Sequence, residues 1–236
     1  MKMKRLAVAG IILLFKVTAF SQTPLPTPLA KTATEEKLHV MAVSTFFAIT
    51  RSFYRDIPTL NNAMQSEDIF KETADEFPEY SYAISPLGDL DKTPVEKRLA
   101  LINASSAGMR AKLSVGEKWQ FDMGTALGGI CGEIFSAEDT NGEMQVSKAN
   151  ASVIRARLAA IQRLNLRAPR SLPKDVRQVF TLLPRLGAKL DLKTKDGLFS
   201  LLEEIVAIID VISAPPREIK GAPPKLITHP PNESRI

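Results

Sequence analysis

Apolar residues recur with the period of an α-helix over almost the whole stretch from residue 34 to residue 213. Side chains that return every three or four positions form one face of a helix, whereas strands need an alternation that no useful length of this chain shows. The pattern predicts an all-α fold, a single-domain bundle of six to seven helices. We place the helices at 34–57, 59–76, 94–113, 115–136, 148–166, 173–190 and 196–213, and expect Pro184 to kink or split the sixth.

Local signals support these boundaries. A hydroxyl residue followed three positions later by Glu is typical of a helix N-terminus, and Thr32, Thr93 and Ser114 each begin such a capping box. Segments 77–93 and 137–147 are rich in Pro, Gly, Asp and Asn and are predicted to be surface loops. The helices at 115–136 and 196–213 are apolar around most of their circumference, so we expect these two at the centre of the bundle.

The first 21 residues have the pattern of a cleavable secretory signal peptide. Three positive charges in residues 1–5 precede an apolar run of ten residues, and small residues then stand at two cleavage positions, before Phe20 and before Gln22. A membrane-spanning helix needs about 20 apolar residues, twice this run. We therefore predict a secreted or periplasmic protein with no transmembrane segment after cleavage.

Proline-rich segments flank the helical domain. Pro24, Pro26 and Pro28 are typical of an extended linker over residues 22–33. Residues 214–236 contain three Pro-Pro pairs and few apolar residues, which predicts a disordered tail. The chain thus divides into a signal peptide (1–21), a linker (22–33), a helical domain (34–213) and a tail (214–236).

Charge is unevenly distributed in the exported part of the chain. Residues 1–21 hold four of the 31 bases and none of the 26 acids, so the remainder is nearly neutral. With few aromatic residues for stacking in its basic part, we expect no nucleic-acid partner. Residues 148–195 nevertheless hold 12 bases and two acids, and Lys148, Arg155, Arg163 and Arg167 share one helical face. This face is either an ordinary solvated surface or a binding patch for an acidic protein or an anionic envelope component.

Three glycines, Gly124, Gly128 and Gly132, recur at every fourth position of the helix at 115–136. Together they cost about 2–3 kcal/mol of helix propensity relative to alanine, so packing or function must compensate for them. One interpretation is a groove that lets another helix of the bundle approach closely. The other is a groove that binds an apolar ligand or a partner helix.

Candidates for catalysis are few. Glu72 and Glu76 stand one helical turn apart and are the residues on which acid–base chemistry would be built, although a solvated acidic surface explains them equally well. His39 is expected to be a packing residue of the first helix, beside Glu35. Cys131, the one cysteine, lies in an apolar helix without a nearby base and is predicted to be buried and unreactive.

Arg157 projects within the apolar arc of its helix. It is expected to reach water with its guanidinium or to pair with a core carboxylate, and a clamp for an anionic ligand is the functional alternative.

These patterns leave two classes of function, of which binding is the preferred one and hydrolysis the alternative. Metal-ligand spacings, glycine-rich phosphate loops and nucleophile elbows do not occur in the sequence, so we predict no metal and no cofactor. The preferred hypothesis is an exported helical binding or scaffold protein without enzymatic activity. The alternative is an envelope-glycan hydrolase that uses Glu72 or Glu76 with a second carboxylate.

Overall fold

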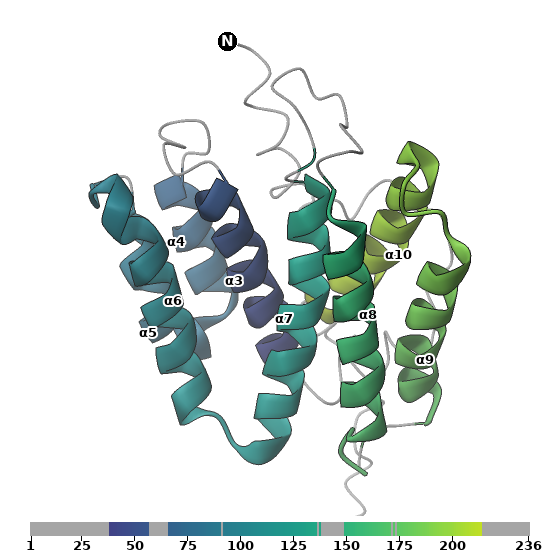
Figure 1. Cartoon of the computed structure of the whole chain (residues 1–236). Helices are drawn as coiled ribbons and strands as arrows, with labels where there is room; N and C mark the ends of the chain where they lie inside the picture. Colours follow the sequence, from purple (N-terminus) through teal and green to yellow (C-terminus); the bar gives the residue numbers. More distant parts are fainter. Residues whose placement is uncertain are drawn as a thin grey trace, which may run out of the picture.

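The computed structural model of the 236-residue chain describes residues 38–56, 66–90, 92–135, 137, 149–170, 172 and 174–213. Within these ranges every regular element is helical and no strand occurs, which confirms the all-α class. The long helices lie side by side as a bundle (Figure 1). They are α3 (His39–Asp56), α4 (Ser66–Glu76), α6 (Val95–Lys112), α7 (Val115–Phe135), α8 (Ala151–Leu166), α9 (Lys174–Lys189) and α10 (Lys195–Ser213). The predicted signal peptide, linker, capping box at Thr32 and tail lie outside the described residues, as do residues 138–147 of the loop predicted at 137–147, whose first residue, Ala137, is described and buried.

Each of the seven predicted helices corresponds to one of these long helices. α9 continues as one helix through Pro184, so of the two predicted effects of this proline, a kink or a split, the split is wrong and the kink stays a prediction. The capping box at the start of α7 is confirmed, because the Ser114 N–H donates to Glu117 Oε2 at 2.8 Å and the Glu117 N–H donates to Ser114 Oγ at 3.4 Å. The box at Thr93 is wrong: its hydroxyl donates to the carbonyl oxygen of Asp89 at 2.9 Å instead.

The segment between α4 and α6 is not the surface loop that its composition predicts. It folds into a 3₁₀ turn η1 (Pro78–Tyr80), a one-turn helix α5 (Ser81–Ile84) and a second 3₁₀ turn η2 (Ser85–Asp89). The side chains of Ile84, Leu87 and Leu90 are fully buried in the core. Proline and glycine here shape short helical turns, and this part of the prediction is corrected accordingly.

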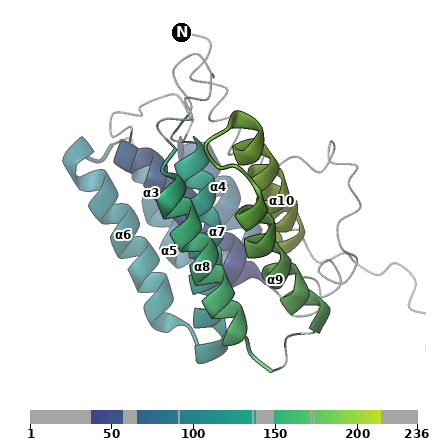
Figure 2. The same ribbon diagram turned by 45° about the vertical axis from the view of Figure 1, so that its right-hand side comes forward.

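The centre of the bundle is the contact between α3 and α7. Figures 1 and 2 both show these two helices between α6 on one side and α9 on the other. α6 packs on α3, α8 packs on α7, and α9 packs on α8, while α10 contacts α3, α7 and α9. The sequence placed residues 115–136 and 196–213 at the centre. The central position of residues 115–136, which form α7, is right, but the helix that packs most extensively on α7 is α3.

Buried hydroxyl groups explain how α3 can be enclosed although its sequence is partly polar. Ser44 and Thr45 donate their hydroxyls to the carbonyl oxygen of Met41 at 3.0 and 2.8 Å, and Ser52 donates to that of Ala48 at 3.1 Å. Because these hydrogen bonds are made within the helix, the hydroxyls need no water and the helix can be buried around most of its surface.

Candidate functional site

The glycine stripe of α7 is the place where the backbone of α3 comes closest. A Cβ atom added to any of Gly124, Gly128 and Gly132 would collide with α3. The first atoms that it would meet are, for the three glycines in turn, Ser44 Oγ, the carbonyl oxygen of Thr45 and Ser52 Oγ. Thr45 Oγ1 also donates to the carbonyl oxygen of Gly124 at 3.1 Å and so joins the two helices. The structure supports the first interpretation of the stripe, a close contact with another helix of the bundle, because α3 fills the groove.

A further glycine of α7, Gly129, faces a different neighbour. The guanidinium of Arg157, which comes from α8, lies so close to the Gly129 backbone that a Cβ there would overlap it. The Nε atom of Arg157 is buried and has no hydrogen-bond partner among the described residues. The side chain of Arg157 as a whole is only partly buried, so the expectation that its guanidinium reaches water stays open, whereas no ion pair with a core carboxylate occurs among the described residues.

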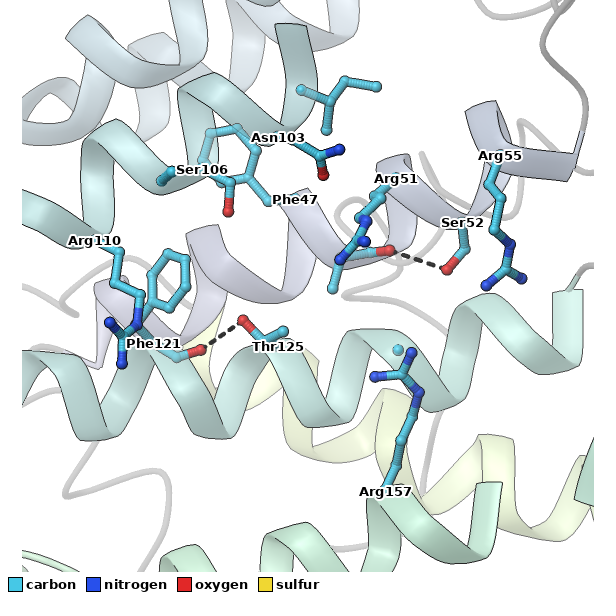
Figure 3. Close-up of a pocket in the computed structure, with 14 residues that line it drawn as sticks. Phe47, Arg51, Ser52, Arg55, Asn103, Ser106, Arg110, Phe121, Thr125 and Arg157 are labelled. Atoms are coloured by element: carbon cyan, nitrogen blue, oxygen red, sulfur yellow. Dashed lines mark hydrogen bonds between the residues drawn. The ribbon is translucent and has the colours of Figure 1, made fainter. Parts of the chain in front are cut away.

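Arg157 lines a cavity of about 310 Å³ that lies between α3, α6 and α7, which we call the α6 pocket. Figure 3 shows Arg51 of α3 and Arg157 extending into this space from opposite sides. Asn103 and Ser106 of α6 and Thr125 of α7 add neutral polar groups to the lining, and Phe47, Ile102 and Phe121 add apolar walls. The pocket thus combines two converging cations with hydrogen-bonding side chains.

Two other arginines of the α6 pocket already have carboxylate partners. Arg55 donates through Nε to Asp56 at 2.7 Å and through Nη1 to the buried Glu133 at 3.1 Å. These contacts raise the pKa of the Arg55 guanidinium, the hydrogen bond to Asp56 having the largest effect. Arg110 binds both carboxylate oxygens of Asp122, through Nε at 3.0 Å and Nη2 at 3.2 Å. The charges of these two arginines are therefore neutralised within the protein.

Arg51 and Arg157 differ from them, since the described residues offer neither of the two an ion pair. Loss of water around Arg157 lowers the pKa of its guanidinium, the charge of Glu133 raises it, and the charges of Arg55 and Arg51 lower it again. An arginine is nevertheless charged at neutral pH. An anion that enters the α6 pocket would meet a guanidinium with at least one unused donor.

A second cavity, the α8 pocket, lies between α7 and α8 and shares Thr125 and Arg157 with the first. Its volume is about 370 Å³, and Arg163 and Arg167 line it. Two of the described arginines of the predicted basic face are thus brought together at one pocket. The third, Arg155, is exposed and lines neither pocket, and Lys148 lies outside the described residues.

The predicted carboxylate pair lies elsewhere, on α4. Glu72 and Glu76 are exposed and line neither pocket. Partial loss of water raises the pKa of Glu76, the charge of His39 lowers it, and that of Glu72 raises it. His39 packs edge-on against Phe77, as a packing residue should, and its Nδ1 is 2.7 Å from Glu79 Oε1. A raised pKa suits a general acid, but neither carboxylate lines one of the two pockets, and the hydrolase hypothesis stays a prediction.

The remaining features to place are the cysteine, possible metal ligands and possible membrane-spanning helices. Cys131 is fully buried, which confirms that part of the prediction, and burial raises the pKa of its thiol to about 12, as is typical of an unreactive cysteine. In the described ranges no group of three or more His, Cys, Asp and Glu residues is arranged to hold a metal ion. None of the described helices is both long enough and apolar enough to cross a membrane.

Comparisons of this chain with protein-family models, with curated proteins and with solved structures found no match. The structure itself shows a helical bundle in which arginines without an ion pair among the described residues line two pockets beside α7 and α8. The sequence pointed to Arg157, Arg163 and Arg167 but missed Arg51 and Asn103. These two come from helices far away in the chain, and no local pattern connects them with α8.

Proposed function

We propose that this chain is an exported helical binding protein, without an enzymatic activity of its own, that holds an anionic group in the α6 pocket. The observation that carries the proposal is the guanidinium of Arg157, which lies on the Gly129 backbone with its buried Nε unbonded. A buried donor without a partner costs about 1–3 kcal/mol. An anion in the pocket would meet the rest of this guanidinium, which is only partly buried, and a carboxylate or phosphate oxygen accepts its N–H donors.

The surroundings of Arg157 favour an anion over a neutral ligand. Arg51 extends toward the same space from α3, and Asn103 and Ser106 supply neutral polar groups on the α6 side (Figure 3). A guanidinium presents its N–H donors in a planar fork that matches carboxylate and phosphate groups. Since Arg55 and Arg110 already bind carboxylates, Arg51 and Arg157 are the cations that a ligand would use.

The α6 pocket would then bind the partners that one interpretation of the basic face predicts, an acidic protein or an anionic envelope component. An acidic side chain of a protein and a phosphate or carboxylate of an envelope component present the same chemical group to Arg51 and Arg157. The low net charge of the exported chain agrees with recognition by a local site instead of by a general basic surface.

Replacing Arg157 with Gln should weaken binding of a small anion at least tenfold. A hydrogen bond to a charged group contributes about 1.5–3 kcal/mol, and about 1.4 kcal/mol corresponds to a factor of ten in affinity. Calorimetric titration of the purified protein at low salt, with inorganic phosphate and with butyrate as probes, measures this effect. Arg155→Gln is the matched control, because it removes the same charge from the same helix outside both pockets.

A second variant, Gly129→Ala, tests the position of the guanidinium without removing its charge. The new Cβ would push the Arg157 guanidinium off the helix, and a flexible side chain can move away at little cost. Alanine also favours the helix by about 1 kcal/mol over glycine. We expect unchanged or higher stability together with weaker anion binding. The proposal fails if the wild-type protein and the Arg157 variant bind both probes equally or do not bind them.

Export itself has a separate test. The mature protein should begin at Phe20 or Gln22, so the intact mass of the protein from its own cell should show the loss of 19 or 21 residues. Recovery of the chain only in full-length, membrane-inserted form would contradict this part of the proposal.

A further inference from the structure

The α6 pocket and the α8 pocket meet at one place in the bundle. Both are lined by Thr125 of α7 and by Arg157 of α8, so these two side chains lie between the two cavities. On the far side of the α6 pocket is Arg51, and the α8 pocket adds Arg163 and Arg167. Arginines without a described partner therefore stand on both sides of Arg157.

The described lining of the α8 pocket contains three arginines and no carboxylate that is free to pair with them. Asp122 is the one carboxylate in its described lining, and both of its oxygens bind Arg110. Arg163 and Arg167 are one helical turn apart and carry like charges, which repel each other in that arrangement. An anion between them would relieve the repulsion.

Apart from its arginines, Asp122 and Thr125, the described lining of the α8 pocket is apolar. Ala126 of α7 and Ala160 and Leu164 of α8 form this part of the α8 pocket, and Phe121 and Phe47 form the apolar walls of the α6 pocket. Such surfaces contact methylene groups favourably and offer no charge. Each of the two pockets thus combines cationic side chains with apolar walls.

We propose that the ligand carries two anionic groups joined by an apolar chain, one bound in the α6 pocket by Arg51 and Arg157 and the other in the α8 pocket by Arg163 and Arg167. The inference rests on the proposed function, because it takes the α6 pocket as the place where the first group binds. Once that group is held, the second binds as if at high local concentration, provided that the chain between them has the right length.

The test is a series of ligands that differ only in length and in the number of anionic groups. The tighter of the two probes, phosphate or butyrate, decides whether the series consists of dicarboxylates or bisphosphonates. Each member is compared, by calorimetry at low salt, with the single-headed compound of equal length. Trp119 is the one tryptophan of the chain, and its Nε1 donates to the carbonyl oxygen of Leu164 at 2.8 Å, so its fluorescence reports on the α8 pocket.

We expect one chain length to bind at least tenfold more tightly than its single-headed counterpart and to shift the emission of Trp119. Arg163→Gln should remove this advantage and leave the binding of the single-headed compound unchanged, while Arg155→Gln should change neither. If no length of the series gives an advantage although Arg157→Gln still weakens binding, the second site is refuted and the proposed function stands. If binding does not depend on Arg157 at all, both are refuted.

Discussion

Replacing Leu87 with alanine should lower the free energy of unfolding by about 2–5 kcal/mol. The side chain of Leu87 is 0% exposed, and it belongs to the segment between α4 and α6 whose composition predicts a surface loop. Removing three buried carbon atoms loses their transfer free energy and leaves a cavity that the surrounding core fills only in part. Urea denaturation followed by circular dichroism measures the change.

The matched control is the same substitution at a leucine outside the core. Leu166, at the end of α8, is 84% exposed, so Leu166→Ala should change the free energy of unfolding by no more than about 0.5 kcal/mol. A similar small effect of Leu87→Ala would mean that the segment lies on the surface after all. A large difference between the two variants would establish that residues 77–90 are part of the folded core.

The second large effect is expected from Gly128→Leu, which should cost about 1–3 kcal/mol or more. A side chain at this position would meet the carbonyl oxygen of Thr45 and the Cβ of Ala48. A flexible side chain could give way, but here it is the backbone of α3 that would have to move. For a domain of this size about 1 kcal/mol corresponds to about 2–4 °C in the thermal midpoint, so a shift of several degrees should be seen in a thermal scan.

Gly116→Leu is the control for this variant. Gly116 lies in the first turn of the same helix, and a Cβ there would have no atom within 4 Å. Because leucine also has the higher helix propensity, we expect this substitution to be neutral or stabilising. Equal thermal midpoints for the two variants would show that the stripe does not contact α3.

The sequence predicts the fold class and the long helices well, because both depend on local periodicity. It does not show that α3 is central, since Ser44, Thr45 and Ser52 count as polar in any pattern and only the structure shows that their hydroxyls bond within the helix. A signal was nevertheless present: small residues at 44, 48 and 52 have the same spacing as the glycines of α7.

The same is true of the segment between α4 and α6. Its prolines, glycine and aspartates are equally common in open loops and in 3₁₀ turns, so composition cannot separate the two. Ile84, Leu87 and Leu90, however, follow one another at intervals of three, the period of a 3₁₀ helix. This spacing indicates that one side of the segment is buried.

The candidate site could be predicted only in part, for a different reason. Arg157 was conspicuous because a charge within an apolar arc is costly, and Arg163 and Arg167 were found from the charge pattern of one helix. Arg51 and Asn103 join them through the packing of α3 and α6 around α7. Which helices become neighbours is a tertiary property that no local pattern contains.

The glycines of α7 also bear on how the chain folds. With five glycines among its 21 residues, this helix has a low intrinsic tendency to form, and the contacts along its glycine stripe come from α3. Thr45 and Gly124, which bond to each other, are 79 positions apart in the chain. We therefore expect α7 to become stable only after a long loop has closed and α3 has packed on it, so that the two helices form together.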